Sequence, residues 1–264
     1  MKFRLLGPVA VYQEPDRLIT PTPRKLRELL ALLLLNANRV VVADDLVEQM
    51  WNSAPPRTAK TALQVYICRL RRHLSVHEGS AERDASTRLV TAPSGYILAV
   101  QEHELDLARF EALCSAARRA ECAGDIERAS LLFGRALGLW RGPALADITG
   151  PAELNAEAGR LNEARLAAQE QHIAMDLLLG RYGTTIPRLT ELIKRQPLRE
   201  GLHEQLMIAQ YHCGRTAEAL ETYRAVRSAL VEELGLEPGA RLKSLQQAIL
   251  NRDPALETRL TPAL

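Results

Sequence analysis

The sequence is poor in aromatic residues and lacks a long hydrophobic run. Its 264 residues include three Phe, two Trp and six Tyr, against 45 Leu and 37 Ala. This bias favours helices and argues against a large β-sandwich or barrel. The longest unbroken apolar run, residues 29–35, has seven residues, whereas a membrane-spanning helix needs about 20. We therefore expect a helix-rich protein of one or two domains without a membrane span.

Cysteine is sparse, and the four Cys form no CxxC pair and have no His at metal-ligand spacing. The N-terminus also lacks the apolar stretch of a signal peptide. The pattern predicts reduced thiols, no metal site and a cytoplasmic location. The GxSxG, HExxH, GxGxxG and P-loop motifs are missing, and the six His are scattered. We therefore expect neither an enzyme nor a bound cofactor.

Acidic residues are missing from one stretch, residues 49–77, in the basic part of the chain. Residues 1–100 carry 14 Lys and Arg against 9 Asp and Glu, a net charge of +5, and residues 101–264 carry 20 against 23, a net charge of −3. A field of one sign indicates a surface that binds anions, although an ordinary solvated surface is the alternative. The basic residues of the acid-free stretch are Arg57, Lys60, Arg69, Arg71 and Arg72.

The elements predicted for the first hundred residues have the order of a winged helix-turn-helix. Apolar periodicity, proline and turn residues define them. The predicted elements are strands at 3–12 and 17–20, a helix from Pro23 to Asn36 or Asn38, an extended stretch at 40–42, a helix capped by Asp44 or Asp45 and ending at Trp51, a helix at Thr58–Leu74 and a hairpin at 89–98.

The third predicted helix, Thr58–Leu74, has two different faces. At 100° per residue, one face collects apolar residues around Leu63 and forms a core stripe. The opposite face has no acidic residue and combines arginine with small or hydrogen-bonding groups, which are the groups that read bases in a major groove. This face carries Thr58, Thr61, Gln64, Val65, Cys68, Arg69 and Arg72.

Strand signals disappear after about residue 106, and helical patterns continue to about residue 251. Gly124, Gly180 and Gly214 mark turns between helices, and the last two are 34 residues apart, the tetratricopeptide period. We interpret the small and large residues that follow these glycines as packing residues. The predicted helices span 106–123, 125–140, 152–180, 184–196, 199–213, 215–234 and 239–251.

Several segments resemble the Streptomyces antibiotic regulatory protein (SARP) family. One set resembles the family's OmpR-type output domain, namely Leu6–Val9, residues 32–38, Trp51 with Pro55 and Pro56, residues 66–74, and Gly95 with Tyr96. A second set resembles the bacterial transcriptional activator domain, namely residues 139–142, 144–147, 197–200, 214–220 and 233–239. The expected fold is an α+β OmpR-type winged helix-turn-helix domain at 1–102, an all-α tetratricopeptide-like domain at 103–253 and a tail at 254–264.

The resemblance implies an activator of a secondary-metabolite (antibiotic) gene cluster in an actinomycete. Such proteins bind direct repeats beside a promoter as a head-to-tail dimer and recruit RNA polymerase through its sigma factor, with region 4 as the expected contact. Pro93 stands where OmpR-type wings usually carry an arginine, so we expect this wing to contact only the DNA backbone. The candidate DNA-binding residues are Arg57, Thr58, Lys60, Thr61, Gln64, Val65, Arg69, Arg71 and Arg72. The candidate polymerase contacts are Trp51, Asn52, Ser53, Pro55 and Pro56.

Two other functions compete with this prediction. A protein-interaction adaptor would use the helical repeats and would leave the acid-free face of the third helix unexplained. A repressor with the same fold is compatible with every residue in the sequence. Salt-dependent DNA binding separates the adaptor from a DNA-binding protein, and transcription assays separate the repressor from an activator.

Overall fold

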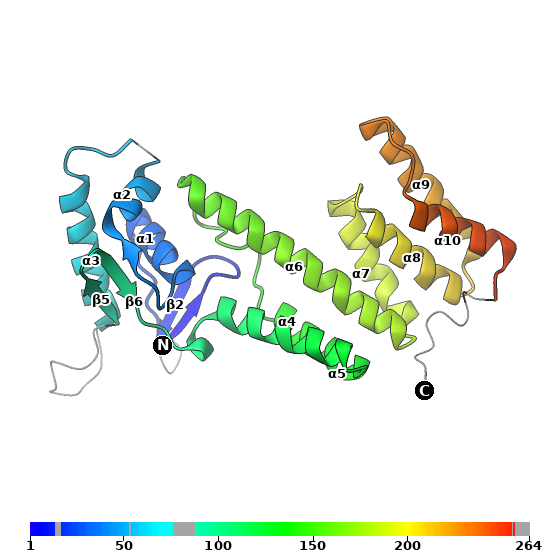
Figure 1. The fold of residues 1–264 in the computed structure, drawn as a ribbon, viewed down its shortest axis with the longest axis horizontal. Coiled ribbons are helices and arrows are strands. Elements are labelled where there is room, and N and C mark those ends of the chain that lie inside the picture. Colours follow the sequence, from blue (N-terminus) through cyan, green and yellow to red (C-terminus); the bar gives the residue numbers. More distant parts are fainter. Residues whose placement is uncertain (14–16, 53, 76–87, 255, 257–264) are drawn as a thin grey trace. The chain divides into compact units, whose positions relative to one another are not determined.

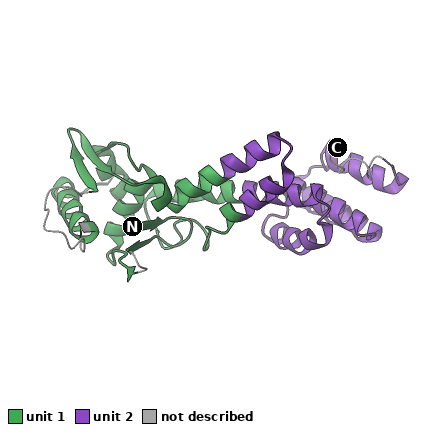
Figure 2. Ribbon diagram, turned by 90° about the horizontal axis from the view of Figure 1, so that it is seen from below, with its two compact units in different colours: residues 1–113, 135–165 green, residues 114–134, 166–264 purple. Residues whose placement is uncertain are grey.

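The computed structural model describes residues 1–13, 17–52, 54–75, 88–254 and 256. The predicted site residue Ser53 and most of the predicted tail at 254–264 therefore lie outside the described residues. The chain divides into two compact units (Figure 2). Unit 1 comprises residues 1–113 and 135–165, and unit 2 comprises residues 114–134 and 166–264.

Unit 1 contains the predicted winged helix-turn-helix (Figure 1). A first antiparallel sheet has the strand order β1-β2-β3, and a second has the order β4-β6-β5, in which β5 and β6 form the wing hairpin. Both the order and the type of the predicted elements are confirmed. The elements are β1 (Lys2–Arg4), β2 (Ala10–Gln13), β3 (Arg17–Leu18), α1 (Arg24–Leu35), β4 (Val41–Val42), α2 (Ala43–Trp51), α3 (Ala59–Ser75), β5 (Leu89–Ala92) and β6 (Gly95–Leu98).

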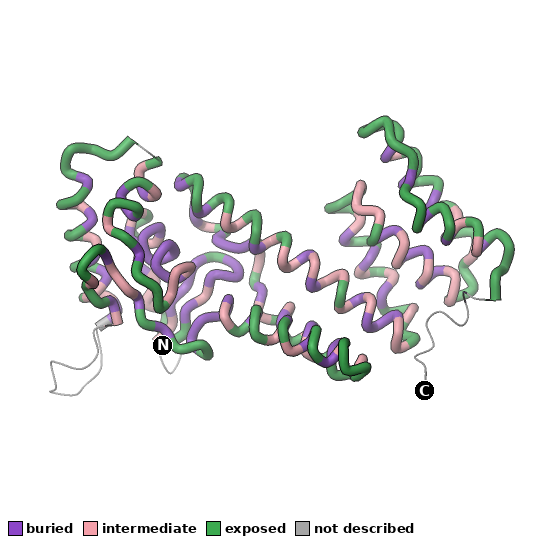
Figure 3. The backbone as a smooth tube through the Cα atoms, in the orientation of Figure 1, coloured by how far each residue is buried: buried purple, intermediate pink, exposed green. Residues whose placement is uncertain are grey.

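The leucine run of α1 forms the centre of the unit 1 core. Every residue from Leu29 to Leu34 is at most 1% exposed, as expected for a helix that is apolar on all sides. The apolar stripe of α3 supplies a second wall, because Leu63, Ile67 and Leu70 are also buried. Figure 3 shows buried and exposed positions alternating around α3. The stripe predicted from the sequence therefore faces the core, and the acid-free face is free to face solvent.

Two local features adjust the predicted hairpin and the second helix. A Cβ at Gly95 would lie 1.9 Å from the carbonyl oxygen of Val41, so glycine permits the close approach of β4 and β6. The predicted cap of α2 is wrong. The helix begins at Ala43 after Val42, and Asp44 and Asp45 lie inside its first turn, where carboxylates interact favourably with the helix dipole.

Unit 1 also includes residues well beyond the winged helix. The Asp106 carboxylate accepts hydrogen bonds from the backbone N–H groups of Leu5 and Leu6 at 2.8 and 3.1 Å. Asp147 accepts one from the N–H of Val9 at 2.7 Å, and the N–H of Arg141 donates to the Leu6 carbonyl. The N-terminal segment is thus held by residues that lie 100 or more positions later in the sequence. Unit 1 extends past the expected domain boundary between residues 102 and 103. That boundary stays a prediction.

Unit 2 is helical throughout its described part. Its helices pack in chain order, with α8 against α7, α9 and α10. Gly124, Gly180 and Gly214 have φ values of 78°, 72° and 75°, the left-handed conformation with which glycine ends helices. No described helix is long and apolar enough to cross a membrane. Complete helices of this unit are α7 (Tyr182–Arg195), α8 (Glu200–His212), α9 (Thr216–Leu234) and α10 (Ala240–Asn251), and α4 (Asp106–Cys122), α5 (Ile126–Leu137) and α6 (Ala152–Leu178) contribute to both units.

A buried carboxylate connects three helices of unit 2. Asp176 is 5% exposed and accepts hydrogen bonds from the Ser130 hydroxyl at 2.8 Å and from Arg181 and Arg188 at 3.1 and 2.7 Å. Burial raises the pKa of Asp176, but these donors outweigh it and hold that pKa below its usual value. Arg188 also donates to Nδ1 of His172. Burial and the neighbouring Arg188 guanidinium lower the pKa of His172.

We expect the protein to lose stability as the pH falls below about 6.5, the usual histidine pKa. Burial lowers the pKa of His203, whose Nε2–H donates to the Pro197 carbonyl at 2.8 Å. The unfolded chain therefore takes up a proton at a higher pH than the folded chain, and stability declines until the folded pKa is passed. Thermal melts from pH 7.5 to 5 should show a shallower decline for His203→Gln than for wild type. The exposed control His103→Gln should keep the wild-type decline, and equal slopes in all three proteins would contradict the prediction.

Candidate nucleic-acid interface

The outward face of α3 presents the residues expected to bind DNA. Val65 is 44% exposed, so its side chain is accessible at this surface. A thymine methyl group would cover such a side chain. The exposed residues of this face and of the preceding turn are Arg57, Thr58, Lys60, Thr61, Gln64, Val65, Cys68, Arg69 and Arg72.

One acidic residue from another helix approaches this surface. The Lys60 ammonium lies 2.7 Å from a carboxylate oxygen of Asp44 on α2, and the side chains are 77% and 71% exposed. Ion pairs this exposed contribute about 0–1 kcal/mol to stability. A phosphate can therefore replace Asp44 as the partner of Lys60 at little cost.

The Arg71 guanidinium binds the wing hairpin. Nε donates to the carbonyl of Leu89 at 2.9 Å, and Nη2 donates to the Thr91 hydroxyl at 2.6 Å. Both partners belong to β5, so Arg71 fixes the wing to α3. Sequence reasoning could not separate Arg71 from its neighbours, because its partners lie 18 and 20 residues away. Pro93 is exposed at the tip of the hairpin. That the wing contacts only the DNA backbone stays a prediction.

The loop between α2 and α3 carries the residues expected to contact polymerase. Pro55 and Pro56 are exposed. The Trp51 ring is half-buried, stacks on Tyr66 of α3 with a centroid distance of 6.4 Å, and has the Lys25 ammonium 5.5 Å from its centroid. Trp51 therefore joins the loop to α1 and α3. Pro55 and Pro56 form the exposed surface of the loop.

The remaining described loop candidate, Asn52, makes contacts across a long sequence separation. Its side-chain Nδ2 donates to the carbonyl of Gly150, and its Oδ1 accepts from the N–H of Ala152, both at 3.0 Å. Both partners belong to unit 1. The loop is thus attached to the connection that leads into α6.

The comparisons with known proteins identify both halves of the chain. Residues 17–92 match the family "Transcriptional regulatory protein, C terminal", and residues 105–250 match the "Bacterial transcriptional activator domain". The chain is 40% identical to Regulatory protein DnrI of Streptomyces peucetius, over 97% of this chain and 94% of that protein. The chain belongs to the SARP family. SARP proteins of this type are DNA-binding transcriptional regulators and not enzymes, and the OmpR-type domain binds the DNA.

Other SARP relatives differ in length. Regulatory protein AfsR of Streptomyces coelicolor is 41% identical over 97% of this chain, which covers 25% of AfsR. A solved structure of EmbR from Mycobacterium tuberculosis, in complex with a low-affinity phosphopeptide, superposes with a TM-score of 0.88. It is 33% identical, and the match covers 98% of this chain and 68% of the EmbR chain. The similarity supports the same fold for this chain and the matched part of EmbR.

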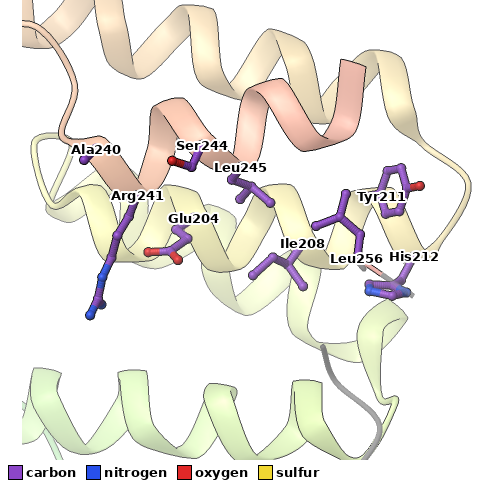
Figure 4. A pocket seen from close by; sticks show the side chains of 9 residues that line it. All are labelled: Glu204, Ile208, Tyr211, His212, Ala240, Arg241, Ser244, Leu245 and Leu256. Atoms are coloured by element: carbon purple, nitrogen blue, oxygen red, sulfur yellow. The ribbon is translucent and has the colours of Figure 1, made fainter. Parts of the chain in front are cut away.

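Unit 2 has a hollow of its own between α8 and α10 (Figure 4). The cavity measures about 470 Å³, and Ile208, Leu245 and Leu256 give it an apolar lining. Glu204 and Arg241 lie at its polar side. Charges of both signs beside an apolar floor select no particular ligand, so the candidate DNA interface stays with α3 of unit 1.

Proposed function

We propose that this SARP protein activates transcription of a secondary-metabolite gene cluster, of the antibiotic type, by binding direct repeats near its promoters. The observation that carries the proposal is the exposed, acid-free face of α3 in an OmpR-type domain. The similarity to DnrI and AfsR of Streptomyces supports the type of gene cluster. Its place of action is the cytoplasm, where bacterial promoters and RNA polymerase meet.

The proposed contacts fall into two classes. Arg57 lies in the turn before α3 and Lys60 in its first turn, and both bind phosphates, which positions the helix. The other exposed residues of this surface read bases, with arginine suited to guanine and Gln64 suited to adenine. Arg71 acts through the wing that it holds. The proposed base-reading residues are Thr58, Thr61, Gln64, Val65, Arg69 and Arg72.

Direct repeats impose a head-to-tail arrangement of two protomers, since each half-site has the same orientation. RNA polymerase holoenzyme then contacts the α2–α3 loop, with sigma factor region 4 as the proposed partner. Support for this part comes from the two exposed prolines, Pro55 and Pro56, immediately before the DNA-reading helix. A protein bound to the adjacent DNA would meet these residues first.

The proposed function is tested by footprinting and salt titration on promoters next to the chain's own gene. We expect protection of two half-sites in the same orientation, because the protomers face the same way. The logarithm of the binding constant should fall linearly with the logarithm of salt, with a slope of about −0.9 for each phosphate neutralised. Inverted half-sites would contradict the head-to-tail dimer, and salt-independent binding would contradict the proposed interface. Reconstituted transcription that decreases on adding the protein would identify a repressor.

A further inference from the structure

Asn52 has a backbone conformation that few residue types adopt without strain. It ends α2 with φ 49° and ψ 52°, in the left-handed region that asparagine tolerates better than most side chains. Its side chain then uses both of its polar groups on one short segment, residues 150–152. We call these two hydrogen bonds the α2–α6 junction.

The junction caps α6 from a distant part of the chain. Ala152 is the first residue of α6, so its N–H belongs to the group of helix-start donors that have no partner within the helix. A residue just before the helix usually accepts from these donors, but here the acceptor is Asn52, 100 residues earlier in the sequence. The start of α6 and the end of α2 therefore hold each other in place.

A buried carboxylate strengthens the same connection. Glu28 is fully buried and pairs with Arg24 at 2.7 Å and Lys25 at 2.8 Å. The Arg24 guanidinium also donates to the Thr149 carbonyl, and the Lys25 ammonium donates to the Met50 carbonyl at 2.6 Å. One carboxylate thus orients the two cations that bind opposite sides of the α2–α6 junction.

The junction is attached to the loop and not to the face of α3 that reads bases. Asn52 directly precedes the segment that carries the exposed Pro55 and Pro56, whereas the exposed face of α3 depends on the apolar stripe behind it. Loss of the junction would consequently release the loop and the start of α6 while leaving α3 packed.

We propose that Asn52 is a positioning residue, which fixes the α2–α3 loop to the start of α6 so that the two segments present one rigid surface to a transcription partner. The role in activation rests on the proposed function, whereas the rigidity of the surface does not. A loop that is fixed only part of the time has a lower apparent affinity for its partner, in proportion to the population of the competent conformation.

The test compares Asn52→Gly with Asn38→Gly in the full-length protein. Both positions have a positive φ, 49° at Asn52 and 64° at Asn38. Glycine tolerates this left-handed conformation in both variants. Asn38 is a matched control, since its side chain also donates to one backbone carbonyl and accepts from one N–H, both of Val100, at 2.8 and 2.9 Å. Both variants therefore lose two comparable hydrogen bonds.

We expect hydrogen exchange at residues 149–154 to become about tenfold faster in Asn52→Gly and to stay unchanged in Asn38→Gly. On a promoter that wild type binds and activates, Asn52→Gly should keep operator affinity within about twofold and lose about fivefold in activation. Gly150→Ala should lose activation in the same way, because Gly150 has φ 137°, a backbone conformation in which a Cβ is strained. The double variant Asn52→Gly/Gly150→Ala should lose no more activation than either single variant, because both changes disrupt the same junction.

Three results would overturn the inference. These are unchanged exchange at residues 149–154 in Asn52→Gly, activation by Asn52→Gly equal to that of Asn38→Gly, and a loss of operator affinity that accounts for the whole loss of activation. A wild-type protein that binds its operator without activating would instead refute the proposed activator function. The exchange measurement would then still decide whether Asn52 fixes the loop to α6.

Discussion

Asp106→Ala is expected to lower the free energy of unfolding by about 3 kcal/mol or more, because each buried donor left without a partner costs about 1–3 kcal/mol. The carboxylate accepts from two backbone N–H groups, those of Leu5 and Leu6, and lies 3.8 Å from the Arg141 guanidinium. Burial raises the pKa of Asp106, and the N–H donors and Arg141 oppose that rise. Alanine removes the acceptor and leaves both donors buried.

Denaturant unfolding of the full chain checks this expectation, with two further variants for comparison. Asp106→Asn keeps one acceptor oxygen, so its stability should lie between those of alanine and wild type. Asp125→Ala is the matched control, because the exposed Asp125 accepts one backbone N–H bond, from Arg128 at 3.1 Å. It should cost about 1 kcal/mol, the usual value for a lost helix cap. A loss for Asp106→Ala no greater than that of the control would contradict the argument.

Local patterns predicted most of the fold. The apolar stripe of α3, the leucine run of α1 and the turn at Pro93 and Ser94 each depend on residues close in sequence, and each is confirmed. The predicted ends of the unit 2 helices are also within a few residues of the observed ends. Periodicity identified these elements because burial repeats every turn of a helix and every second residue of a strand.

Long-range polar contacts were beyond the reach of the same patterns. Asp106 and Asn52 each bind backbone groups about 100 residues away, and no spacing in the sequence marks such a pair. The same reason explains why residues 135–165 join unit 1 although they follow several helices. A chain cut after residue 102 would lose the Asp106 and Asp147 acceptors together. The sequence also placed Arg71 among the candidate DNA contacts. A sequence shows the charge of Arg71 but not the β5 residues that it binds.

Arg69→Ala is expected to weaken operator binding by about 1–3 kcal/mol and to relax specificity at one base pair, as happens when a bidentate arginine contact is lost. Arg69 is exposed on the acid-free face of α3, one helical turn beyond Val65. The double variant Arg69→Ala/Arg72→Ala should lose about twice as much if the two contacts are independent.

Binding measured at several salt concentrations, on the operator and on an unrelated duplex, distinguishes base reading from charge alone. Lys60→Ala should weaken binding to both duplexes equally and reduce the salt slope by about one, because its proposed partner is a phosphate. Arg69→Ala should instead weaken operator binding much more than binding to the unrelated duplex. Arg128→Ala removes an exposed arginine from unit 2 and should leave both affinities unchanged. If Arg69→Ala weakens both duplexes equally, Arg69 contacts the backbone, and if it changes neither, α3 is not the helix that reads the operator.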